Sequence, residues 1–104
     1  MTPAAVELDR AIRDGFPIFG ATAEIEALVS RPWASITFSG ERHRLTFRIE
    51  GERAPDAADA FLDGLSEREF ELRGHIMADI ALVEDARDGD TIRLTLEALT
   101  VEAS

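Results

Sequence analysis

Residues 69–102 read EFELRGHIMADIALVEDARDGDTIRLTLEALTVE, and this stretch decides the fold. Every second residue from Phe70 to Leu82 is apolar or glycine, while the residues between them are mixed in character. Residues 92–98 repeat the same alternation. A period of two is typical of strands with one buried face, and the three- and four-residue spacing of a helix is missing. Because the acidic segment 85–90 contains glycine and reads as a turn, the stretch predicts a long antiparallel hairpin.

The second face of this hairpin is expected to become apolar away from the turn. Counting back from the turn places Met77 opposite Leu99. The same counting places His75 opposite Val101. A strand that is apolar on both faces needs a cover, which either a helix of the same chain or a second chain supplies. The sequence leaves both covers open, and the second one predicts a homodimer.

The remainder of the chain predicts two helices. The first begins at Thr2 and Pro3, since threonine caps helices and proline suits their first position, and it ends before Gly15. The apolar connector 16–20 that follows is expected to plug one end of the core. The second helix begins near Asp56, which is expected to cap it, and its apolar face consists of Ala58, Phe61, Leu62 and Leu65.

Three further strands are expected between these helices. Residues 23–29 alternate as a strand, with a helix as the alternative because alanine and glutamate favour helices, and Pro32 is expected to stop it. Residues 33–38 and 44–50 then form a hairpin with its turn at 39–42. We therefore predict a single α+β domain over 1–104, with an antiparallel sheet of about five strands, two helices and the order α-β-β-β-α-β-β.

Composition narrows the classes of partner. A chain of 104 residues without cysteine has no disulfides, and its length hides roughly 65% of its unfolded surface, enough for a core without them. The 21 acidic residues against 11 arginines give a net charge of −10, which disfavours nucleic acid and anionic membranes. With no secretory signal and no long apolar run, we expect a cytoplasmic protein.

Residues 74–80 and 96–101 resemble segments of small proteins from GC-rich bacteria, a resemblance that implies no function. The absence of lysine fits the same genome composition.

The candidate chemistry of the chain centres on Arg44 and Arg48, which share one side of a predicted strand. Guanidinium groups suit carboxylates and phosphates, so these residues, with His75, predict an anion site. The alternative interpretation is ion pairing across the sheet, and the acidic partners it names are Glu24, Glu26 and Glu50.

No other pattern predicts chemistry. The aspartates around Gly89 fail the calcium-loop pattern, because Thr95 stands where its bidentate glutamate belongs. No serine or threonine lies in a nucleophile or phosphate-loop context. We expect neither a metal nor a cofactor, and the sequence leaves enzymatic activity open while favouring none.

Two functional hypotheses follow. The favoured one is a non-enzymatic module that self-associates and binds another protein, through an interface formed by Trp33, Met77, Leu99 and Val101. The alternative is a small anionic-ligand-binding protein or enzyme, with a pocket lined by Arg44, Arg48 and His75.

Overall fold

A computed structural model provides the structure, which describes residues 1–16 and 21–103. Its elements are α1 (Pro3–Asp14), β1 (Thr22–Ala34), β2 (Ser39–Glu50), α2 (Ala54–Leu62), a short 3-10 helix η1 (Leu65–Glu67), β3 (His75–Asp88) and β4 (Thr91–Glu102). The α+β prediction is confirmed, with the order α-β-β-α-β-β and four strands rather than about five.

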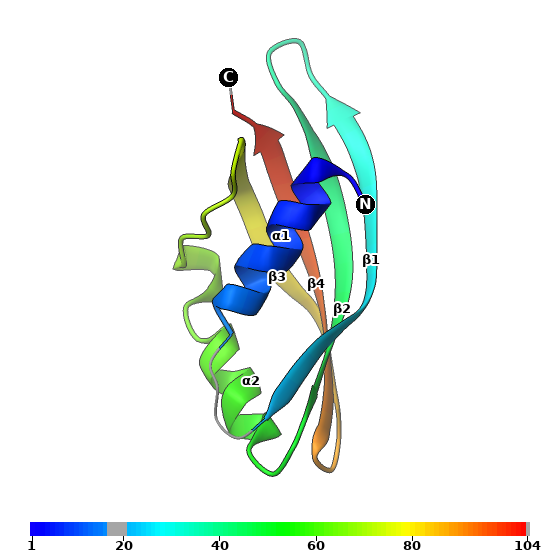
Figure 1. The fold of residues 1–104 in the computed structure, drawn as a ribbon, viewed down its shortest axis with the longest axis vertical. Helices are drawn as coiled ribbons and strands as arrows, with labels where there is room; N and C mark the ends of the chain where they lie inside the picture. The colour runs from blue at the N-terminus through cyan, green and yellow to red at the C-terminus, as the bar shows by residue number, and fades with distance from the viewer. Residues whose placement is uncertain (17–20, 104) are drawn as a thin grey trace.

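The four strands form an antiparallel sheet in the order β1-β2-β4-β3. Both helices lie on the same side of this sheet (Figure 1), which we call the inner face. The opposite side, the outer face, has no helix over it among the residues that the structure describes. The strands at the two edges, β1 and β3, therefore flank a central pair formed by β2 and β4.

The core lies between the central pair of strands and the two helices. Alternate residues of β2 and β4 point to the inner face and are buried, as the alternation predicts, namely Leu45, Phe47, Ile49, Ile92, Leu94 and Leu96. Leu8 and Ile12 of α1 cover them from one helix, and Phe61 of α2 covers them from the other. Burying each large side chain contributes about 1.5–3 kcal/mol of transfer free energy, so this layer supplies most of the driving force.

Three aromatic rings close one end of the core. The ring centroid of Phe16 lies 5.1 Å from that of Phe47 and 5.7 Å from that of Phe61. The first of these contacts is edge-to-face, the arrangement that aromatic quadrupoles favour. The predicted plug is thus confirmed for Phe16, while residues 17–20 lie outside the described part of the chain.

The first helix begins and ends as predicted. The Thr2 hydroxyl accepts a hydrogen bond from the Ala5 amide at 3.2 Å, and the helix ends at Asp14 with Gly15 after it. The second helix differs at its start, since Arg53 is its N-cap residue and Asp56 lies in the first turn instead of capping it. No helix in the described residues is both long and apolar enough to cross a membrane.

The strand predicted at 23–29 continues through Pro32 to Ala34 as β1, so of the strand predicted at 33–38 only the first two residues are strand, and they belong to β1. Proline has no amide hydrogen to donate, but β1 is an edge strand, where the missing donor is tolerated. A β-bulge between Ile25 and Ala27 shifts the alternation by one residue. The helix alternative for this segment was wrong.

The turn of this hairpin lies at residues 35–38, earlier than the predicted 39–42. The Ser35 amide donates to the Phe38 carbonyl at 2.7 Å, which closes the turn. Gly40 is consequently a strand residue, paired with Trp33 on one side and Val101 on the other.

The C-terminal hairpin is confirmed, but the predicted register was wrong. Strand β3 begins at His75 rather than Phe70, and β-bulges shift its pairing after Met77 and after Leu82. Each bulge adds one residue to β3 and reverses the side to which the following residues point. Met77 therefore pairs with Thr100 and packs against the core.

The neighbours of Met77 change accordingly. Ile76, rather than His75, pairs with Val101, and Asp79 pairs with Leu99. The apolar character of both faces is preserved, because Met77 lies on the inner face and Ile76 replaces it on the outer face.

Gly40 provides a test of this packing. A Cβ atom at this position would collide with the main-chain carbonyl of Thr100. We expect Gly40→Ala to lower the free energy of unfolding by more than about 2 kcal/mol, because the two strands would have to separate. Gly89→Ala is the control, since its φ of 60° is strained but no atom lies within 4 Å, and it is expected to cost about 1 kcal/mol. Urea denaturation showing equal losses would contradict the close approach.

Candidate functional site

The outer face carries an apolar patch at the end of the sheet nearest the β1–β2 turn. Register places Trp33, Gly40, Val101 and Ile76 in one line across the four strands, and Leu99 lies in the next line. Ile76 is 58% exposed, and Trp33, Leu99 and Val101 are each half-buried. We call Trp33, Ile76, Leu99 and Val101 the distal patch.

The indole of Trp33 lies against Gly40, its partner across the sheet. A Cβ atom on Gly40 would be 3.0 Å from the indole Nε1, so the absence of a side chain there makes room for the ring. The indole Nε1 is buried and has no hydrogen-bond partner within the described residues. Tryptophan anchors many protein interfaces because a rigid ring buries much area with little loss of entropy.

The turn of the β1–β2 hairpin adds two exposed apolar side chains near this patch. Ile36 is fully exposed and Phe38 is 56% exposed. Figure 1 shows that this turn rises beyond the end of β4, so neither residue has a neighbouring strand to pack on. Exposed apolar groups that gather at one end of a molecule are typical of protein-binding surfaces.

The middle of the outer face and its end away from the distal patch carry a network of ion pairs. Arg48 contacts Glu24 at 2.8 Å, and it also contacts Glu26 and Glu50. The pairing named by the alternative interpretation of Arg48 is therefore confirmed. Arg93, which lies directly opposite Arg48, contacts Glu26 at 2.8 Å.

The other predicted anion ligands lie apart. Arg44 contacts Glu97 at 2.8 Å on the outer face, where both side chains are more than half exposed. His75 begins β3 and lines a different cavity of about 600 Å³, beside Arg10 and Met77. The structure thus brings Arg44 and Arg48 to one face but separates them from His75. Anion binding by these residues stays a prediction.

A second cavity, of about 460 Å³, lies over the outer face next to the distal patch. Its lining comes from all four strands, and the charged residues of that lining are Arg31, Arg42, Arg44, Asp79 and Glu97. Because one hollow reaches from the β1 edge to the β3 edge, this part of the outer face is concave.

A buried histidine stands behind the same region on the inner face. His43 is 1% exposed, and its Nδ1 and Nε2 lie 2.7 Å and 2.9 Å from the hydroxyls of Ser30 and Thr100. Burial lowers the pKa of His43 below its ordinary value of 6.5, because the charged ring loses its hydration. This buried position of His43 was not predicted, although the alternation places His43 on the same side as Leu45.

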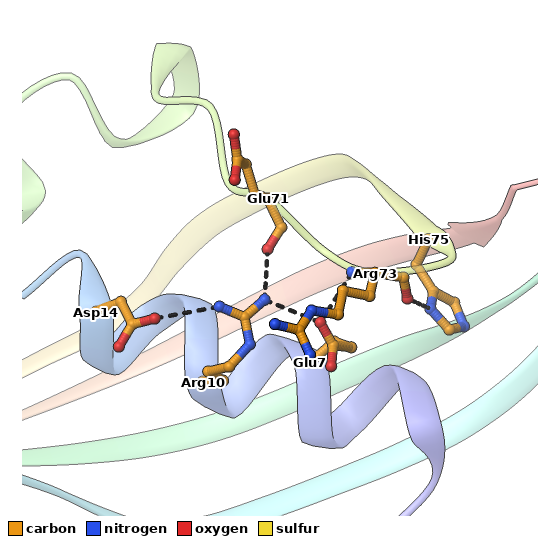
Figure 2. A network of polar contacts seen from close by, with 6 residues as sticks. All are labelled: Glu7, Arg10, Asp14, Glu71, Arg73 and His75. Carbon is orange, nitrogen blue, oxygen red and sulfur yellow. Dashed lines mark hydrogen bonds and ion pairs between the residues drawn. The ribbon is translucent and has the colours of Figure 1, made fainter.

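A polar clamp holds the segment before β3 to α1 (Figure 2). The Arg10 guanidinium donates to the Glu7 carboxylate at 2.9 Å and to the Glu71 carbonyl at 3.0 Å. The same carboxylate accepts the Arg73 amide at 2.8 Å. Hydrogen bonds from Arg10 and then Arg73 lower the pKa of Glu7. The clamp fixes the segment from which Ile76 enters the outer face.

The comparisons with known proteins concern the fold. No family model matches the sequence, and no curated protein matches it either. Among solved structures, the chain is similar to one from a structure described as "Virion of native gene transfer agent (GTA) particle". The TM-score is 0.67 at 16% sequence identity, and the match covers 96% of this chain and 98% of the other. This likeness extends over nearly the whole of both chains.

We predict that stability depends on the protonation of His43. Since its pKa is lower in the fold than in the unfolded chain, the unfolded state binds more protons as the pH falls through about 6.5. The free energy of unfolding is therefore expected to be highest above that pH and to decrease as the pH falls below it. Chemical denaturation across this range should show the decrease in the native protein and in His75→Gln. His43→Gln, which lacks the titrating group, should lose most of the slope.

We predict that Glu7→Gln releases the segment before β3. The neutral amide loses the ion pair with Arg10 and the charge-assisted hydrogen bond from the Arg73 amide. Hydrogen exchange measured on a peptide covering 71–75 should become faster. Asp9→Asn is the matched control, because Asp9 pairs with Arg13 of the same helix and does not contact that segment. Equal exchange in both variants would contradict the clamp.

Proposed function

We propose that this protein is a non-enzymatic structural subunit that assembles with other proteins of a phage-like particle, and that the outer face is its contact surface. The observation that carries the proposal is the distal patch, an apolar surface on a sheet face that no helix covers among the described residues. The similarity in fold to a chain of a gene transfer agent virion supports the proposal, because it extends over nearly the whole length of both chains.

The character of the surface supports assembly rather than chemistry. The arginine and glutamate side chains near the middle of the outer face form ion pairs with one another. Such exposed pairs contribute little to stability, typically 0–1 kcal/mol, but they fix the positions of charges. Protein interfaces combine apolar and polar residues, and the distal patch with the ion pairs beside it has this composition.

The proposal predicts that the protein travels with particles. In native cells induced to produce particles, a peptide-tagged chain should sediment with the particle fraction in a density gradient. Trp33→Ala should be depleted from that fraction by about tenfold or more, as expected for loss of a buried aromatic anchor.

The matched control is Val6→Ser, which removes an exposed apolar side chain from α1 on the other side of the molecule. Circular dichroism should show that both variants keep the native fold. Recovery of particles that contain none of the unmodified chain would contradict the proposal. So would equal incorporation of Trp33→Ala and the native protein.

A further inference from the structure

The outer face contains one charge imbalance. Arg31 and Arg42 lie directly opposite each other on β1 and β2, and both are exposed. Within the described residues, neither forms an ion pair. Like charges directly opposite each other across a sheet are destabilising. A pair of uncompensated arginines is unexpected in a protein with 21 acidic residues.

The same face shows how such a pair is normally compensated. Arg48 and Arg93 are also directly opposite each other, and the Glu26 carboxylate lies between them at 3.7 Å and 2.8 Å. One carboxylate thus serves two guanidinium groups. The corresponding position over Arg31 and Arg42 has no carboxylate from the described part of this chain, so it suits a carboxylate from a partner.

A second copy of this chain could supply that carboxylate, because Asp79 is well placed to do so. Asp79 occupies the same line across the sheet, in the order Arg31, Arg42, Leu99, Asp79 from β1 to β3. It is exposed, and it forms no ion pair in the part that the structure describes. The line is therefore basic at the β1 end and acidic at the β3 end, and both ends border the same cavity.

This line of residues is complementary to the same line in a second copy when the two copies are related by a two-fold axis parallel to the strands. The rotation reverses the order of the strands, so the β1 end of one copy faces the β3 end of the other. Arg31 then faces Asp79 of the second copy. In the adjacent line, Trp33 faces Ile76 of the second copy. Opposite charges and apolar groups meet in register.

The direction of the strands fits the same arrangement. In an antiparallel sheet of four strands, the first and last strands run in opposite directions, and the rotation preserves these directions. The β1 edge of one copy and the β3 edge of the other therefore meet as antiparallel neighbours. Because the outer face is concave here, two copies meet first at these edges.

The available area is also sufficient. Strands of twelve residues in a four-stranded sheet present a face of roughly 40 by 19 Å, about 750 Å². Stable protein interfaces bury roughly 600–1,000 Å² on each partner, a range that includes this area. The face is thus large enough for a dimer, and it needs no segment beyond the strands.

We propose that the outer face binds a second copy of this chain about a two-fold axis, with Asp79 of each copy seated on Arg31 and Arg42 of the other. The inference rests on the proposed function and deepens it, since it names the first partner in the assembly. The distal patch supplies the apolar area of this interface, and the Arg–Asp contacts select its orientation.

Charge reversal tests the arrangement. Sedimentation velocity over micromolar to millimolar concentrations should show a dimer for the native protein. Asp79→Arg, and the double variant Arg31→Glu with Arg42→Glu, should each weaken dimerisation by at least about tenfold. An equimolar mixture of the two variants should restore the dimer as a heterodimer, identified by mass in native mass spectrometry.

Matched controls change the net charge equally on the inner side of the molecule. Asp63→Arg controls for the single variant, and Arg13→Glu with Arg53→Glu controls for the double one. Both should dimerise like the native protein. Where the double charge reversal fails to fold by circular dichroism, Arg42→Ala replaces it and should weaken the dimer in the same direction.

The outcomes separate this inference from the proposed function. A native protein that is monomeric throughout, variants that dimerise as tightly as their controls, or a mixture that forms no heterodimer would overturn the inference. A monomeric protein that still sediments with particles leaves the proposed function intact. A dimer that is absent from particles removes the proposed function and leaves the two-fold contact standing.

Discussion

The pairing of β2 with β4 in the middle of the sheet is the contact on which the rest of the structure depends. It joins Leu45 to Leu96 and Phe47 to Leu94, and all four side chains are fully or almost fully buried under the helices. Both helices pack on this layer, and both edge strands are attached to it. A sheet built in this way has one covered face and one open face, so the same pairing that forms the core also creates the outer face.

No helix covers the outer face in the described residues, and the side chains there are held in place by ion pairs. Near its middle and far end, arginines are matched with glutamates, and Glu26 serves two of them. At the distal end, Trp33 and its apolar neighbours replace the ion pairs, and two arginines stand without a counter-ion among the described residues. The change from matched to unmatched charge occurs where the surface becomes apolar and concave. This coincidence is the reason for proposing the distal end as a contact surface.

Much of the fold was predictable from periodicity, because burial on one face imposes a period of two on strands and leaves a capped, amphipathic pattern in α1. The class, both helices and both hairpins follow from that pattern. The length of β1 could not be predicted from the pattern. Pro32 ends a strand only where the neighbouring strand needs the amide hydrogen that proline lacks, and the pattern does not reveal which strand lies at an edge. The bulges in β3 were equally hidden, because an extra residue changes the register without changing composition.

These errors of register limited the prediction of the site. Leu99, Val101 and Trp33 lie on the outer face, but a bulge moves Met77 to the core and leaves Ile76 in its place. The unmatched pair of Arg31 and Arg42 becomes visible only when the turn is placed at 35–38, four residues before the predicted one. Single side chains were thus easier to predict than their neighbours across the sheet, which depend on every bulge and turn between them.

The central position of β4 has a consequence for biosynthesis. Among the elements of this sheet it is the last to be synthesised, yet it lies between β2 and β3, which are made before it. Until it is available, the earlier hairpin and β3 have no common partner, and the apolar side of β2 is exposed in a nascent chain. Contacts between segments so distant in sequence form slowly, and such exposed strands are prone to aggregate. The chain is therefore expected to complete its core only after β4 has been translated, and a chaperone bound to the apolar side of β2 would protect the chain until then.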